Sequence, residues 1–71
     1  MSESVVKVTV NGEPREVVRG TTIRSLLESL RIPPERVAVE VDAEVVRRAR
    51  HAEHRLQGGE KVEIVTFVGG G

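Results

Sequence analysis

The sequence predicts an α+β fold in which one main helix packs on one face of a mixed sheet of about four to five strands. Two observations predict it. Several short segments alternate apolar and polar residues with the period of a strand, and only one segment has apolar residues at helical spacing. These segments follow the order strand, strand, helix, strand, strand. The chain has 71 residues, so we expect a single domain over residues 1–71.

The first two strands form a predicted hairpin. Residues 6–10 alternate valine with polar residues, and Asn11-Gly12 follows. Asn-Gly is the strongest short hairpin signal because a type I′ turn requires positive φ at both central residues. The return strand runs through residues 15–18. Pro14 lacks an N–H group, so it should lie at the beginning of that strand or on an unpaired edge.

The helix is predicted after Gly20, with Thr21 or Thr22 as its N-cap. Pro33-Pro34 is expected to stop it. Four residues at i, i+3, i+4 and i+7 form one apolar stripe that should face the core: Ile23, Leu26, Leu27 and Leu30.

The second half of the chain supplies the remaining strands. Residues 37–41 alternate as a strand, and Asp42-Ala43 makes a turn into a short extended return over residues 44–46. Residues 47–57 are interpreted as a loop with one short helical turn, anchored by Ala49, Ala52 and Leu56. The last strand, residues 62–68, has apolar residues on both faces, which indicates a central position beside the first strand. This arrangement is the β-grasp, or ubiquitin-like, architecture.

Composition excludes several classes of function. The chain has no cysteine, so thiol catalysis and cysteine-type zinc sites are excluded. Eleven basic and eleven acidic residues cancel, and Phe67 is the only aromatic residue, which argues against a nucleic-acid partner. The sequence contains no apolar run of membrane length and no signal-peptide pattern, so we expect a cytoplasmic protein without a membrane partner.

The most informative segment is the C-terminal run Gly69-Gly70-Gly71. Glycine has no Cβ, so we expect residues 69–71 to form a thin flexible tail that enters a channel too narrow for side chains. In this interpretation Gly69 and Gly70 are the threading segment. The carboxylate of Gly71 is then unhindered and can act as a nucleophile toward an activated phosphate. A small body with such a tail is typical of a carrier, whereas the alternative is an ordinary frayed chain end.

These segments resemble a known family. Residues 37–46 and 56–71, the hairpin at residues 11–13 and the helix start at residues 20–27 are similar to the ThiS family, the sulfur carriers of the thiamine pathway. The sequence departs from the family pattern in three turns. Asp42-Ala43 stands where Asn-Gly is common, Arg47 where proline is frequent, and Gly59-Glu60 where Gly-Asp is common.

The resemblance implies a protein co-substrate rather than an enzyme. An adenylating enzyme (ThiF-like) would use ATP and Mg²⁺ to attach AMP to the Gly71 carboxylate, so this chain binds no cofactor stably. A sulfur donor fed by a cysteine desulfurase would displace AMP and leave a thiocarboxylate. Thiazole synthase (ThiG-like) would then take the sulfur. Val65, Phe67 and Val68 are the predicted partner-binding residues, because exposed apolar groups beside a functional tail often mark an interface.

Other functions remain open at this point. The same tail chemistry would serve a carrier for molybdopterin synthesis, a carrier for tRNA thiolation or a ubiquitin-like modifier. A different class is a non-catalytic β-grasp interaction module, which would not use the Gly71 carboxylate at all.

Two further clusters have competing interpretations. His51 and His54 could share a metal, but two imidazoles fall short of the four ligands of a structural zinc site. We therefore expect no metal and interpret both as solvated loop residues. The basic stretch Arg47–Arg55 could be a partner contact or a nucleic-acid patch, and we favour a solvated loop.

Overall fold

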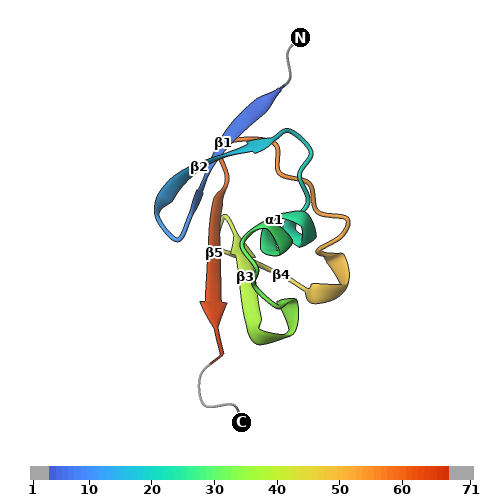
Figure 1. Cartoon of the computed structure of the whole chain (residues 1–71). Coiled ribbons are helices and arrows are strands. Elements are labelled where there is room, and N and C mark those ends of the chain that lie inside the picture. Colours follow the sequence, from blue (N-terminus) through green and yellow to red (C-terminus); the bar gives the residue numbers. More distant parts are fainter. Residues whose placement is uncertain (1–3, 68–71) are drawn as a thin grey trace.

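The computed structural model describes residues 4–67 (Figure 1). Five strands, one α-helix and two 3₁₀ helices follow one another in this order: β1 (Val5–Val10), β2 (Glu13–Val18), α1 (Ile23–Ser29), η1 (Pro34–Arg36), β3 (Val37–Val41), β4 (Glu44–Val46), η2 (Arg48–Arg50) and β5 (Lys61–Thr66). None of the helices within residues 4–67 is long and apolar enough to cross a membrane.

The five strands form one mixed sheet in the order β2-β1-β5-β3-β4. β5 lies in the centre, parallel to β1 and antiparallel to β3, while the two hairpin pairs are antiparallel. The predicted α+β fold and the central position of the last strand are therefore confirmed. Pro14 lies on β2, an edge strand. No strand pairs with the outer edge of β2, so a missing N–H group on that edge interrupts no hydrogen-bonded ladder.

Both hairpin turns have the type I′ conformation. Asn11 and Gly12 have φ of 51° and 85°, and Asp42 and Ala43 have φ of 53° and 72°. The Asp42 carboxylate also accepts a hydrogen bond from the Lys61 N–H at 2.9 Å, which ties the second turn to the start of β5. Aspartate tolerates positive φ, whereas alanine adopts it at a cost of roughly 1 kcal/mol.

The start of α1 follows the sequence prediction. Thr22 is the N-cap, and its hydroxyl oxygen accepts the Ser25 N–H at 3.0 Å. Three residues of the predicted stripe are fully buried and the fourth is partly buried; the buried ones are Ile23, Leu26 and Leu27.

The end of α1 was predicted wrongly. The helix stops before it reaches Pro33-Pro34, because Arg31 takes a left-handed conformation with φ of 60°. The Ile32 N–H donates to the Leu27 carbonyl at 2.9 Å, which is the six-to-one bond of a Schellman motif. Glycine is the usual residue at the Arg31 position of that motif, so the sequence lacked the signal for this boundary.

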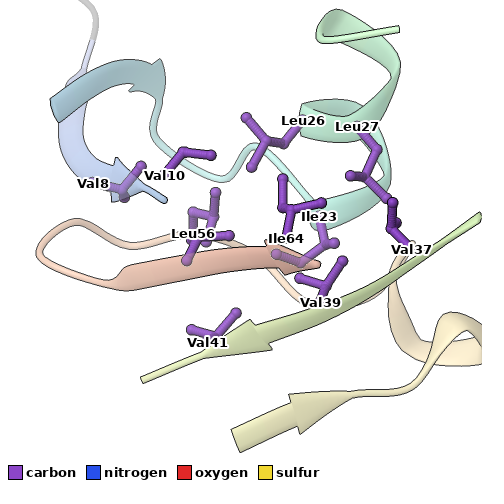
Figure 2. Close-up of a cluster of buried hydrophobic side chains, with 11 residues drawn as sticks. Val8, Val10, Ile23, Leu26, Leu27, Val37, Val39, Val41, Leu56 and Ile64 are labelled. Carbon is purple, nitrogen blue, oxygen red and sulfur yellow. The ribbon is translucent and has the colours of Figure 1, made fainter. Parts of the chain in front are cut away.

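The core lies between α1 and one face of the sheet (Figure 2). Valines from β1 and β3, together with Val62 and Ile64 of β5, point toward the leucines of α1. No second helix covers the opposite face of the sheet among residues 4–67 (Figure 1). One face of β5 therefore packs into the core, and the other face is not covered by a helix among residues 4–67.

The segment between η2 and β5 is anchored mainly by Leu56. This side chain is fully buried, and its N–H donates to the Thr21 carbonyl at 2.8 Å. The predicted short helical turn is η2. The prediction that Ala49 and Ala52 anchor this segment is wrong, since both residues are exposed. His51, which follows η2 directly, turns inward instead.

Replacing Ala43 with glycine should stabilise the protein. Glycine adopts φ of 72° without the steric cost that a Cβ imposes there, so we expect Ala43→Gly to raise the free energy of unfolding by about 1 kcal/mol. The midpoint of thermal unfolding should rise by about 4–8 °C.

The matched control is Gly12→Ala in the first hairpin. A Cβ at Gly12 meets no atom within 4 Å, so its cost is conformational only, and the variant should unfold at a lower temperature. A lower midpoint for Ala43→Gly would contradict the assigned turn.

Candidate functional site

The candidate site is built where β5 leads toward the glycine run. The backbone of β5 is fixed as far as Phe67, whose N–H donates to the Arg36 carbonyl at 2.9 Å. This bond continues the pairing with β3 by one residue beyond the strand. Val68, Gly69, Gly70 and Gly71 lie outside the described residues. Their predicted roles therefore stay predictions, but the point from which the run departs is defined.

Asn11 fixes β5 from the opposite side. Its Oδ1 accepts the Ile64 N–H at 2.7 Å, and its Nδ2 donates to the Ile64 carbonyl at 3.2 Å. β1 pairs with β5 through Val10 and Val62, so the amide of Asn11 extends this parallel ladder after β1 has turned away. Sequence reasoning assigned Asn11 only to the turn. The signal for its second role is its chemistry, because a primary amide presents the same donor and acceptor as a peptide group.

The outer face of the sheet beside the departure point is apolar. Val65 and Phe67 are 53% and 61% exposed, as expected for the predicted partner-binding residues. The structure adds Val45 on β4, which is 65% exposed. Ala38 lies directly opposite Val65 on β3. The outer patch, defined as Ala38, Val45, Val65 and Phe67, therefore crosses three strands.

Sequence reasoning missed Val45 because its segment is only three residues long. The alternation in residues 44–46 does not say which of two adjacent valines faces outward. The register does, because Val46 pairs with the buried Val39 and Val45 pairs with the outward-facing Glu40.

A hollow of about 380 Å³ opens at the edge of this patch. Ala38, Val45 and Phe67 line it from the sheet, and Arg47 and Arg48 line it from the segment that follows β4. Glu35 and His51 also line the hollow, so its lining carries both acidic and basic groups.

His51 is buried, with 4% of its surface exposed, so its interpretation as a solvated loop residue is wrong. Its Nε2 lies 2.9 Å from the Val46 carbonyl oxygen, and because a carbonyl only accepts, Nε2 is the donor of this hydrogen bond. Nδ1 has no hydrogen-bond partner in the described part of the chain. The ring holds η2 against β4. His54 is partly exposed, so the two histidines differ in environment.

No group of three or more His, Cys, Asp or Glu side chains is placed to share a metal ion within residues 4–67. In the basic stretch, Arg50 pairs with Glu53 at 2.9 Å, and Arg55 donates to the Gly20 carbonyl at 3.3 Å. Arg50 and Arg55 thus have partners close in sequence or in space. Arg47 and Arg48, which lie nearest the outer patch, form no ion pair within residues 4–67.

The fold and the site together define a ubiquitin-like β-grasp protein whose central strand leads to a glycine run. The family model that matches this chain is that of the ThiS family, over residues 8–71. The chain belongs to the ThiS family.

Similar proteins agree with this assignment. The crystal structure of the thiamine biosynthesis protein ThiS from Geobacter metallireducens is 33% identical, with a TM-score of 0.81 over 93% of this chain and 100% of that one. Thiazole synthases of Magnetococcus marinus and Paramagnetospirillum magneticum are 42% and 38% identical over 93% of this chain. The chain spans 20% of the length of each of these two relatives.

The three turns that depart from the family pattern keep ordered geometry. Asp42-Ala43 retains the type I′ turn, and Arg47 has φ of −64°, the angle that proline would impose. The Glu60 carboxylate accepts the N–H groups of Gln57 and Gly58 at 2.8 and 2.7 Å. Each of these three segments therefore has a defined local conformation in this chain.

Removing the Asn11 amide should weaken the anchor of β5. We expect Asn11→Gly, which keeps the positive φ but loses both side-chain bonds, to lower the free energy of unfolding by about 1–3 kcal/mol. Urea denaturation measures the loss. Amide exchange at Ile64 should accelerate more than exchange at residues of the β3–β4 hairpin. Equal stability of Asn11→Gly and the native protein would show that the two bonds contribute nothing.

Proposed function

We propose that this chain is the sulfur carrier that supplies thiazole synthase, with the Gly71 carboxylate as the modified group. The carboxylate oxygen attacks the α-phosphate of ATP in an adenylating partner, and pyrophosphate leaves. Sulfide (HS⁻) then attacks the acyl carbon, AMP leaves, and a thiocarboxylate remains. ATP, Mg²⁺ and the catalytic groups belong to the partner.

One observation supports this proposal most directly. The central strand is fixed to Phe67 by its bond to Arg36 and leads straight into a segment that contains only Val68 and three glycines. Four residues extend at most about 13–14 Å, so a partner that holds the domain also places Gly71 within that reach. A carrier requires a rigid domain that a partner can bind and a narrow segment whose carboxylate can enter the partner's active site.

Thiazole synthase is the acceptor that the relatives favour. The two similar proteins that bear this name contain a stretch like this chain within a longer polypeptide. A carrier and the enzyme that consumes its sulfur would benefit from being joined, because linkage raises their effective concentration. For a separate chain, the outer patch would provide the contact instead.

The modification is tested by intact mass spectrometry. After incubation with the adenylating enzyme, ATP and a sulfide donor, we expect a gain equal to the exchange of one oxygen for sulfur, localised to Gly71. A control chain with one alanine added after Gly71 should fold normally and gain nothing. An unchanged mass with an enzyme that thiocarboxylates its own known carrier would refute the proposal.

The docking role of the outer patch is tested with serine substitutions. Phe67→Ser and Val65→Ser should each raise the KM for this chain in the adenylation reaction by about 10-fold or more, because each removes 1–2 kcal/mol or more of buried apolar contact. The kcat should change little.

Val18→Ser is the matched control, since Val18 is 62% exposed on β2, remote from the departure point. It should leave KM unchanged. All three sites are exposed, so thermal midpoints should stay close to the native value. An equal effect at Val18 and Val65 would exclude a localised docking surface.

A further inference from the structure

Two carboxylates face each other across the outer side of the sheet. The β3–β5 register places Glu40 directly opposite Glu63, and the β3–β4 register places Val45 on the other side of Glu40. In the next row toward the end of β5, Ala38 lies opposite Val65. Glu40 and Glu63 are both half-buried. The pair, called here the carboxylate pair, is thus set among the apolar residues of the outer patch.

Neither member of the carboxylate pair forms an ion pair within residues 4–67. The ion pairs of this range join Arg24 to Glu28 and Arg50 to Glu53. Lys61 precedes Glu63 by two residues on the same face of β5, yet it forms no ion pair with it in this range. Opposed like charges on neighbouring strands have Cβ atoms about 4.5–5.5 Å apart and destabilise a sheet.

In the free protein, the surrounding water lowers the repulsion between the two carboxylates. Repulsion between two carboxylates is weak at high dielectric and is further screened by salt. The same two groups become costly when a partner covers Val45 and Val65, which are 65% and 53% exposed and lie beside them. Removing water from an unpaired carboxylate costs several kcal/mol, whereas burying one valine gains only about 1.5–3 kcal/mol.

We propose that the carboxylate pair is a recognition element for a cationic side chain, best an arginine, on the adenylating partner. This inference rests on the proposed function, in which the outer patch is the docking surface. A guanidinium presents five N–H donors in a planar fork, so one arginine can bond to both carboxylates at once. The cation removes the repulsion and the desolvation cost together.

The test compares stability and binding in the same variants. Glu40→Gln and Glu63→Gln each remove one charge and keep the size of the side chain. In the free protein they should raise the thermal midpoint by about 1–5 °C, because the repulsion is relieved. In the complex they should raise the Kd for the adenylating enzyme by about 10-fold, measured by titration calorimetry at 0.15 M salt.

The double charge reversal with Glu40→Lys and Glu63→Lys should raise that Kd by at least about 100-fold and make the association rate rise with salt, because salt then screens a repulsion. Glu16→Gln is the matched control. Glu16 faces the same side of the sheet on β2, but it lies opposite Lys7, so its loss should leave the Kd unchanged.

The outcomes separate the two proposals. Thiocarboxylation of the native chain tests the carrier function, whatever the variants do. If the native chain is modified, and the glutamine variants bind as tightly as it does while Val65→Ser binds weakly, then the patch docks without a cation and the inference is wrong. Opposite signs of the stability and affinity changes would support it, since a purely structural role moves both in one direction.

Discussion

The position of β5 between β1 and β3 is the constraint on which the rest of this structure depends. A central strand has hydrogen-bonding partners on both edges, so its backbone is fixed to its end. β1 turns away from β5 after Val10. The side chain of Asn11 then forms the hydrogen bonds to the Ile64 backbone that a further residue of β1 would otherwise form. β3 continues the pairing to Phe67 through the Arg36 carbonyl. The point from which the glycine run departs is therefore held from two sides.

The division of the sheet into two faces follows from the small size of the chain. A domain of this length buries only about 60% of the surface that its unfolded chain exposes, so it forms one core rather than two. α1 and Leu56 complete that core on one side, with Val62 and Ile64 as the contribution of β5. The other side keeps exposed valines and opposed carboxylates, which contribute little or nothing favourable to folding. This uncovered side is the docking surface that we propose.

This organisation is consistent with the carrier function that we propose. A carrier supplies no catalytic group; it supplies a surface that a partner can hold and an end that the partner can modify. Here β5 and the residue that follows it present the exposed side chains of Val65 and Phe67, next to the point where the described chain ends. The carboxylate pair adds a charge pattern to an otherwise apolar surface. Charge patterns of this kind contribute more to partner choice and orientation than to raw affinity.

Local chemistry was sufficient for much of the fold. Alternating valines identified the strands, Asn11-Gly12 identified the first turn, and Thr22 identified the start of α1, because each of these signals acts between residues close in sequence. The apolar character of Val65 and Phe67 and the glycine run also pointed to the candidate site. The end of α1 was not predictable in the same way, since Arg31 occupies a position that glycine usually holds.

Tertiary structure decided what depends on register and on packing between distant segments. A strand pattern does not say which residue of a neighbouring strand lies opposite, so the pairing of Glu40 with Glu63 appears only in the assembled sheet. The inward turn of His51 and the exposure of Ala49 depend on how η2 meets β4, which no local propensity encodes. The sequence by itself determined most of the elements and the presence of the glycine run. Packing determined which side chains surround Phe67, because contacts between residues far apart in the chain form only in the folded state.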